Sequence, residues 1–185
     1  MRRFGQKKEN KNIWIPLFII GIMVLSALGY AVLQGNENSI KVHGVKFVKT
    51  QDNFWVAKIK GVSYMFYFSP EDVKALQMDN FTLPTFVYLT SNPEANYSRD
   101  NLMTIESAKF ELKNSLLAAG YTAVMNFSNK ITCKNANPAT AVVDLDLGNE
   151  TKIVADGNCI LVRGTDAVKL VAARDKFLMR ALGVY

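Results

Sequence analysis

The sequence has few residues of the kinds that build metal sites and nucleophilic sites. Two cysteines, Cys133 and Cys159, and one histidine, His43, occur among 185 residues. A structural zinc site usually takes four cysteine or histidine ligands, so these three residues cannot supply one without carboxylates. A cysteine nucleophile needs a base, and nothing in the sequence brings His43 to either cysteine. We therefore expect no metal and no cofactor, and we interpret His43 as an ordinary strand residue near a membrane surface.

Sequence motifs of common enzymes are missing as well. No G-x-S-x-G, S-x-x-K or G-x-x-x-x-G-K-[ST] occurs in the chain, so the usual grounds for proposing a serine hydrolase or a phosphate-binding loop are absent. No internal repeat or low-complexity tract is present either. Because an enzyme can lack local motifs, the sequence leaves catalytic activity undecided and favours a protein without one.

Charge is absent from one long segment near the N-terminus. Residues 13–33, IWIPLFIIGIMVLSALGYAVL, are 21 residues without a charged side chain. As a helix they would span ~31 Å, close to the ~30 Å hydrocarbon core of a bilayer. Residues 1–12 carry five basic residues against one acidic residue, which predicts a cytoplasmic N-terminus. A cleavable signal peptide is the alternative, but its apolar region is usually only about 7 to 15 residues long.

These features predict a single-pass protein of the plasma membrane with its C-terminal domain outside. The expected parts are a cytoplasmic basic tail (1–12), a transmembrane helix in contact with the lipid bilayer (13–33), a linker (34–39) and an extracytoplasmic domain (40–185). Most of the net charge of +6 belongs to the tail, so it is weak ground for a nucleic-acid partner, and none is expected. The expected partner is instead an unidentified envelope or cell-surface protein.

Short segments of apolar and β-branched residues predict strands after residue 39. Ile40–Val48, Asn53–Lys60 and Val62–Phe68 are separated by short turns and predict a three-stranded antiparallel meander. The run VSYMFYF is apolar or aromatic at nearly every position, which favours a central strand covered on both faces. Further strands are predicted at Thr85–Thr90, Tyr121–Phe127, Val142–Leu147, Lys152–Ala155 and Cys159–Arg163.

Helix-start signals and apolar periodicity predict two to three amphipathic helices. These are a short helix at Pro70–Met78, capped by Ser69, one from about Thr104 to Ala119, and a last one at Asp166–Leu182. Because strands neither alternate strictly with helices nor lack them, the predicted fold class is α+β. The full expectation is an N-terminal transmembrane helix followed by one ectodomain of antiparallel strands packed with these helices.

The two cysteines lie 26 positions apart in the C-terminal β region. An even number of cysteines in an oxidising compartment most simply forms a disulfide, here Cys133–Cys159. Unpaired structural cysteines, or a reactive or metal-binding Cys159, are the alternatives. Possible N-glycosylation sites, given by four N-x-[ST] sequons on the exported side, are Asn80, Asn96, Asn126 and Asn149.

Two further groups of residues could form binding sites. In DLDLGNE, Asp144–Glu150, the oxygen donors are spaced somewhat as in a calcium loop, but their alternation with leucines predicts outward-facing carboxylates on a strand. The aromatic group consists of Phe54, Trp55, Tyr64, Phe66, Tyr67 and Phe68. It fits a β core better than a binding face, although any exposed member would be the first candidate for a partner surface.

The C-terminal third, from Ile131 to Tyr185, resembles a group of small uncharacterised archaeal single-pass membrane-anchored extracytoplasmic proteins. The likeness lies in Cys133, the GNET turn, the GNC turn that contains Cys159, and the closing amphipathic helix. The resemblance implies an exported, disulfide-bearing domain. It implies no activity, so no catalytic residues carry over.

The sequence therefore favours a membrane-anchored extracytoplasmic structural or protein-interaction module at the cell surface. A membrane-proximal enzyme acting on the envelope is the alternative, and a pocket joining His43 to a carboxylate or serine would favour it. A pilin-like subunit is a further alternative. Lys7, Lys8 and Lys11 argue against it, because they interrupt the junction expected between the leader and the helix.

Overall fold

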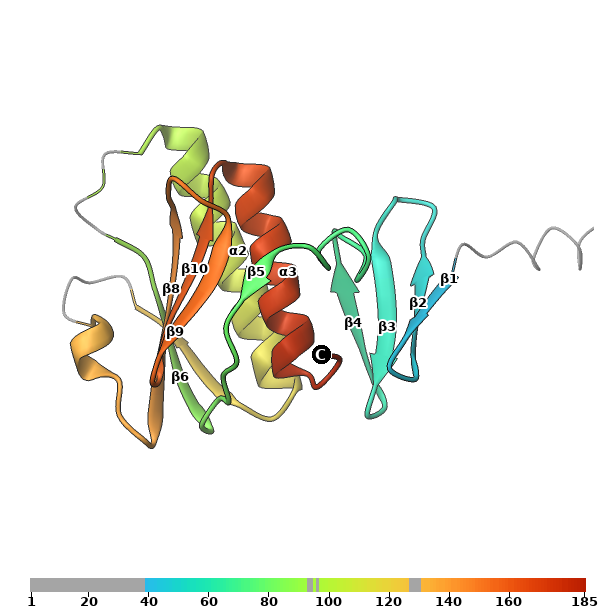
Figure 1. Cartoon of the computed structure of the whole chain (residues 1–185), viewed down its shortest axis with the longest axis horizontal. Helices are drawn as coiled ribbons and strands as arrows, with labels where there is room; N and C mark the ends of the chain where they lie inside the picture. Colours follow the sequence, from blue (N-terminus) through green and yellow to red (C-terminus); the bar gives the residue numbers. More distant parts are fainter. Residues whose placement is uncertain (1–38, 93–94, 96, 127–130) are drawn as a thin grey trace, which may run out of the picture. The chain divides into compact units, whose positions relative to one another are not determined.

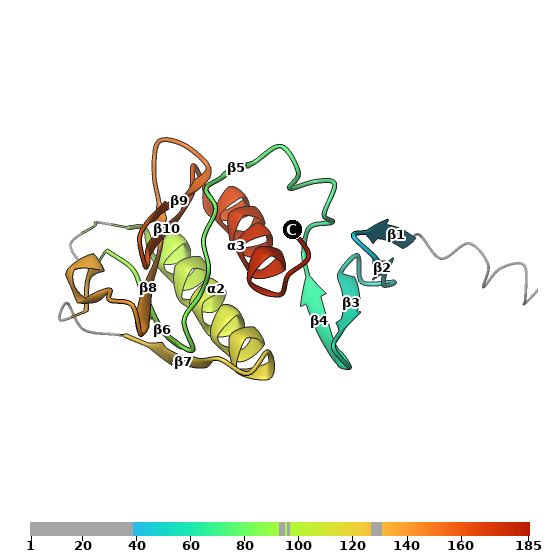
Figure 2. The same ribbon diagram turned by 60° about the horizontal axis from the view of Figure 1, so that its bottom comes forward.

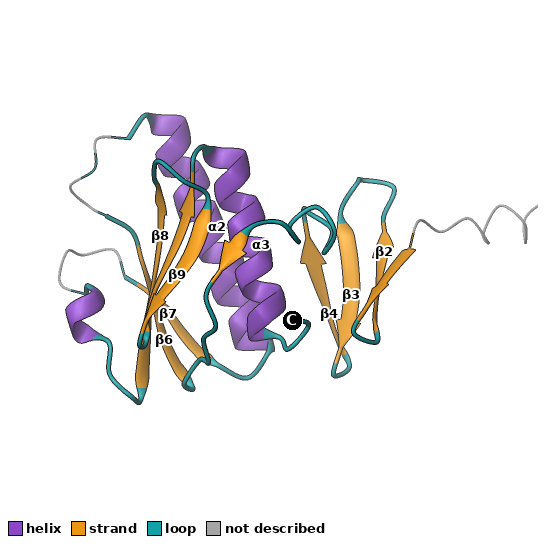
Figure 3. Cartoon of the chain, in the orientation of Figure 1, coloured by secondary structure: helices purple, strands orange, loops and turns teal. Residues whose placement is uncertain are grey.

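The computed structural model describes residues 39–92, 95, 97–126 and 131–185, and in these residues two helices lie between two β-sheets (Figures 1 and 2). The first sheet has four strands in the order β1-β2-β3-β4, and the second has six in the order β5-β9-β10-β8-β6-β7. The helices are α2 (Arg99–Ala118) and α3 (Ala167–Ala181). Figure 3 shows both of them between the strands of the two sheets.

The first sheet is an antiparallel meander of β1 (Ser39–Val42), β2 (Val45–Lys49), β3 (Trp55–Ile59) and β4 (Val62–Phe66). The single strand predicted at 40–48 is divided at His43 and Gly44, whose positive φ angles of 45° and 86° form a tight hairpin turn. The prediction that VSYMFYF is a central strand is wrong, because among the described strands β4 pairs only with β3 and forms an edge of the sheet.

The second sheet is mixed, so the expectation of antiparallel strands is wrong for it. It consists of β5 (Gln77–Met78), β6 (Phe86–Thr90), β7 (Thr122–Met125), β8 (Thr140–Leu147), β9 (Lys152–Asp156) and β10 (Cys159–Gly164). Only β9 and β10 pair antiparallel, and the other four pairings are parallel. The turns after β8 and β9 look alike in the sequence, but β10 inserts between β8 and β9 and keeps those two apart.

The core lies where α2 and α3 pack against the two sheets. Fully buried side chains come from every layer: Phe47 and Phe66 from the first sheet, Val143 and Ile160 from the second, and Leu112 and Phe177 from the helices. The compact unit that holds this core runs from Ser39 to Tyr185. Residues 39–185 therefore have the anatomy of one domain with its own core.

The predicted last helix is confirmed, and the preceding one begins earlier than expected. Asp166 caps α3 by accepting the Lys169 N–H, and Ser98 caps α2, which begins at Arg99 rather than near residue 104. The backbone of α3 lies very close to Gly164, the last residue of β10. A Cβ at this position would lie 2.1 Å from the backbone nitrogen of Leu170. A side chain at this position would push α3 away from the sheet.

The short helix predicted at 70–78 is absent, and the segment forms successive turns followed by β5. Tertiary contacts occupy its backbone carbonyl groups. The Lys176 ammonium donates to the carbonyls of Lys74 and Leu76, and the Tyr185 hydroxyl donates to the carbonyl of Pro70. These carbonyls bond to α3 and the C-terminus instead of to a local helix, so the helix-start signals at Ser69 produce only a turn.

The expectation of a transmembrane helix also needs correction. Among the residues that the structure describes, no helix is long and apolar enough to cross a membrane. The physical reason is charge, because α2 carries six charged residues and α3 carries five. The segment 13–33, for which the helix was expected, lies outside the described residues, as do the tail (1–12) and nearly all of the linker (34–39).

The predicted disulfide is confirmed, since Cys133 bonds to Cys159 and their Cα atoms are 5.1 Å apart. The bond ties a 3₁₀ turn at Cys133–Asn135 to the first residue of β10. Cys159 is 6 % exposed. Because both sulfur atoms are in this bond, the alternatives of unpaired, reactive or metal-binding cysteines are excluded.

Candidate functional site

A row of three open pockets lies along α2, two of them lined by residues of β4 and the third by Tyr67, the residue that follows β4. The first, of about 260 Å³, shares Tyr64 and Ala118 with the second, of about 290 Å³. The second shares Glu111 with the third, of about 340 Å³. We call this row the β4–α2 groove and define it by Ser63, Met65 and Tyr67 on the strand side and Ser107, Glu111 and Ala118 on the helix side.

The strand side of the groove is an open sheet edge. Because β4 pairs with β3 alone among the described strands, its other side presents backbone N–H and C=O groups without a ladder partner. Side chains alternate along it, with Tyr64 and Phe66 buried in the core. Met65 and Tyr67 are instead 49 % and 40 % exposed. Tyr67 is thus an exposed member of the aromatic group that the sequence marked as the first candidate for a partner surface.

A charged network at the middle of the groove connects its two sides. The Tyr67 hydroxyl donates to Glu111 Oε1 at 3.0 Å, and Arg174 Nη1 lies 3.0 Å from Glu111 Oε2. The Arg174 guanidinium also lies 5.3 Å from the centroid of the Tyr67 ring, within cation–π range. Burial raises the pKa of Tyr67, and its hydrogen bond to Glu111 adds to the rise, so the phenol stays protonated as a donor. These contacts hold Tyr67 in place over α2 and α3.

Asp175 fixes the end of β4 to α3 beneath this network. Its carboxylate Oδ2 accepts the backbone N–H groups of Tyr67 at 2.7 Å and Phe68 at 2.9 Å, and Oδ1 lies 3.2 Å from Arg174 Nε. The side chain is 0 % exposed. Burial raises the pKa of Asp175 from 3.8 to about 6, since the loss of hydration outweighs the opposing effects of Arg174 and the two N–H groups.

The raised pKa of Asp175 predicts that stability falls as the pH rises from about 4 to about 6. The folded protein binds this proton more tightly than the unfolded chain, whose aspartates titrate near ~3.9. The resulting stabilisation is present at low pH and is lost as the pH rises through the folded-state pKa of about 6. Asp175→Asn cannot ionise and should lack this fall. Urea unfolding of both proteins across this range measures it, and a difference in stability that stays constant with pH would contradict the assignment.

An uncovered apolar stripe on α2 adjoins the groove. Met103, Phe110 and Leu117 follow one another at intervals of seven residues and are 62 %, 54 % and 45 % exposed. This spacing places them on one face of the helix. Met103 also lines the third pocket. Apolar surface therefore continues from the groove onto the outside of the helix, as is typical of surfaces that bind other proteins.

His43, the single histidine, lies in the β1–β2 turn rather than in a strand. Its Nδ1 is 2.7 Å from the carbonyl oxygen of Val184, so Nδ1 carries the proton and donates. Its ring meets Tyr185 edge to face, with 6.4 Å between the centroids. In the part of the chain that the structure describes, these contacts connect His43 to the C-terminus and not to a carboxylate or a serine.

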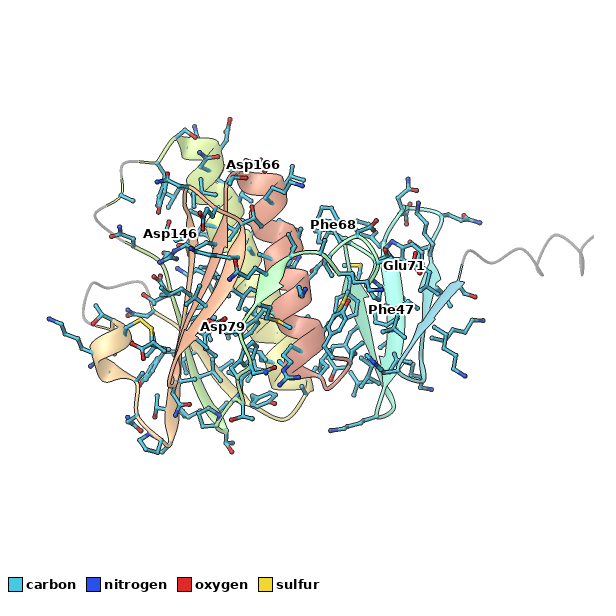
Figure 4. All side chains as sticks on the ribbon, viewed as in Figure 1. Phe47, Phe68, Glu71, Asp79, Asp146 and Asp166 are labelled. Carbon is cyan, nitrogen blue, oxygen red and sulfur yellow. A yellow bond between two sulfur atoms is a disulfide. The ribbon has the colours of Figure 1, made fainter. Side chains whose placement is uncertain are left out.

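Two of the three carboxylates of DLDLGNE, those of Asp144 and Asp146, are not outward-facing, contrary to the prediction, whereas Glu150 is exposed. Asp144 Oδ2 forms a 2.7 Å ion pair with Arg163 Nη2, and Asp146 is only 4 % exposed. Burial raises the pKa of Asp146, while Arg163 opposes the rise. Asp146 lies near the end of β8, and Asp166 lies at the start of α3 (Figure 4). Within the described residues, no group of three or more histidine, cysteine, aspartate or glutamate side chains could hold a metal ion.

The four sequons differ in accessibility. Asn80 and Asn149 are exposed, whereas Asn126 is half-buried and donates to the carbonyl of Ile131 at 3.4 Å. Asn96 lies outside the described residues. Glycosylation at all four positions remains a prediction.

Sequence analysis did not identify Glu111, Arg174 or Asp175 as site residues. One signal was present, because Arg174, Asp175 and Lys176 interrupt a helix segment whose flanking positions, Ala172, Ala173, Phe177 and Leu178, are apolar. Charged residues are rarely buried unless they are paired, and here Arg174 and Asp175 are 1 % and 0 % exposed. Their partners, however, come from β4 and α2, more than 60 positions earlier in the chain, and no local pattern connects them.

Comparison with known proteins identifies no relative. No protein-family model matches the chain, and neither the curated proteins nor the solved structures contain a match. The resemblance of the C-terminal third to archaeal membrane-anchored proteins therefore stays a prediction, and any function must be argued from the site.

Proposed function

We propose that this protein is an extracytoplasmic protein-interaction module that binds an extended segment of a partner protein in the β4–α2 groove. The observation that carries the proposal is the open edge of β4 beside a row of three pockets. The backbone of a bound segment would pair with β4, and its alternate side chains would enter the pockets. Side chains on one face of a strand repeat every ~6.6 Å, so successive residues on that face can reach successive pockets.

An unsatisfied donor at the middle of the groove supports this use. Arg174 lines the second pocket, and its Nη2 has no hydrogen-bond partner among the described residues. Buried donors of this kind are rare and call for an explanation. Because Nη2 is itself buried, a carbonyl or carboxylate of the bound segment would satisfy it only after the pocket lining shifts, while Glu111 and Asp175 keep the rest of the guanidinium in position.

The proposed location is outside the cytoplasm, and the Cys133–Cys159 disulfide supports it. Disulfides persist in oxidising compartments and are rare in reducing ones. The proposed partner is accordingly another envelope or cell-surface protein. The rival proposal of an envelope enzyme has less support, since His43 bonds to Val184 and lines none of the described pockets.

Blocking the groove should abolish peptide binding. Ala118 is exposed and lines two of the pockets, so Ala118→Trp fills the groove without disturbing the core. Peptides selected on the wild-type protein from a random library should bind this variant at least about tenfold more weakly, a loss of ~1.4 kcal/mol. Val168→Trp is the matched control, because Val168 is an exposed helix residue, 62 % accessible, away from the pockets.

Two outcomes would contradict the proposal. One is equal binding of the selected peptides to both tryptophan variants. The other is the absence of backbone pairing, which hydrogen–deuterium exchange measures directly. Peptide binding should slow amide exchange in β4 around Ser63 and Met65, and unchanged exchange there would show that the segment binds elsewhere.

A further inference from the structure

Three lysines line up across the first sheet on its outer face. Lys41 of β1 lies directly opposite Lys46 of β2. Phe47 of β2 pairs with Ala57 of β3, so one step along that register places Lys46 opposite Lys58. All three lysines are exposed. Neighbouring strands are ~4.8 Å apart, so the row concentrates three positive charges within about 10 Å. We call it the lysine row.

An apolar row runs beside the lysine row on the same face. Val48 pairs with Val56, and Val56 pairs with Met65, which aligns the three side chains across β2, β3 and β4. The side chains of the opposite face, among them Phe47, Ala57 and Phe66, are buried in the core. Among the described elements, none covers the outer face in either view (Figures 1 and 2). The outer face therefore presents a cationic row and an apolar row side by side.

The meander as a whole carries an excess of positive charge. Residues 39–68 contain five lysines and one acidic residue, Asp52, which lies in the turn between β2 and β3. Like charges directly opposite one another destabilise a sheet. The like charges of Lys41, Lys46 and Lys58 therefore do not favour the pairing of these strands, and together they would attract an anionic surface.

We propose that this outer face docks on an anionic phospholipid surface. The lysine ammonium groups would contact lipid phosphates, and Val48, Val56 and Met65 would face the boundary between headgroups and acyl chains. The apolar row favours lipid over a soluble polyanion, because a polyanion would use the lysines alone. Met65 belongs to both this face and the β4–α2 groove, but Lys41, Lys46 and Lys58 line none of the groove's pockets. The proposal rests on the lysine row and does not require peptide binding in the groove.

Residue-by-residue acetylation of lysines in the full chain tests the proposal. The protein is mixed with vesicles of phosphatidylcholine alone, or of equal parts phosphatidylcholine and phosphatidylglycerol, and labelling is followed by mass spectrometry. On the anionic vesicles, Lys41, Lys46 and Lys58 should react at least ~5-fold more slowly, because each lysine near an anionic surface contributes about this factor in binding. About 0.5 M salt should reverse the effect, since it screens surface charge. Lys134 and Lys169, exposed elsewhere in the fold, should react equally on both vesicles.

A double variant distinguishes vesicle binding through the lysine row from vesicle binding through any other part of the chain. In K41Q/K58Q, Lys46 remains as the reporter, and its protection on anionic vesicles should disappear. In the matched variant K134Q/K169Q the protection of Lys46 should persist. Equal protection on neutral vesicles, or protection of Lys46 that survives K41Q/K58Q, would overturn the proposal. Protection by dextran sulfate but not by vesicles would also overturn it and assign the face to a soluble polyanion.

Discussion

Replacing Asp175 with alanine should lower the free energy of unfolding by about 3 to 5 kcal/mol, because it removes one partner of a buried ion pair. The carboxylate accepts the backbone N–H groups of Tyr67 and Phe68 and lies beside Arg174. The variant would leave two backbone donors and a guanidinium in the interior without their acceptor. Each such unsatisfied group costs about 1 to 3 kcal/mol.

Urea unfolding of the oxidised protein at neutral pH measures this loss. Asp156→Ala is the control, since Asp156 is exposed at the end of β9, and it should change stability by no more than ~0.5 kcal/mol. Because Asp175 holds the last residues of β4, Asp175→Ala should also weaken peptide binding in the groove. A loss below about 1 kcal/mol would mean that water replaces the carboxylate and that Asp175 is not what fixes β4 to α3.

Removing the disulfide should cost roughly 3 to 4 kcal/mol, the chain-entropy value for a closed loop of this size. The bond joins residues 26 positions apart and ties the segment before β8 to the start of β10. In a Cys133→Ala/Cys159→Ala variant the unfolded chain regains the freedom that the cross-link removes. The expected loss is a large part of the ~5 to 15 kcal/mol that stabilises a typical domain.

Denaturant unfolding of the double variant, compared with the oxidised and the reduced wild-type protein, measures the effect. The reduced wild type and the double variant should agree within about 1 kcal/mol, because Cys159 is a small, largely buried side chain and alanine replaces it with another small one. A double variant as stable as the oxidised protein would show that the loop is already ordered without the cross-link. The disulfide would then give no support to the proposed location.

Local sequence signals predicted an element correctly where the tertiary contacts of that segment favour the same conformation. The last helix was expected at Asp166–Leu182 and is found at Ala167–Ala181, because its apolar face favours nearly the same boundaries. The segment at 70–78 has comparable start signals but forms turns. There Lys176 and Tyr185, about 100 or more positions later in the chain, take the carbonyl groups that a helix would use.

The position of a strand in a sheet could not be read from its composition. VSYMFYF is apolar throughout, which usually means a strand covered on both faces, yet β4 is an edge strand. Tyr64 and Phe66 enter the core, whereas Met65 and Tyr67 line the groove. An edge that binds a partner and a buried central strand need the same kinds of residue, so their sequences look alike.

The sequence by itself determined the α+β class, most of the strand segments, the last helix and the cysteine pair, because periodicity, composition and residue counts are local or additive properties. Only the tertiary structure decided the parallel pairings of the second sheet, the open edge of β4, and the meeting of Tyr67, Glu111, Arg174 and Asp175. These features join residues far apart in the chain. Which distant segments become neighbours depends on how all of the apolar faces are buried together, and no single segment carries that information.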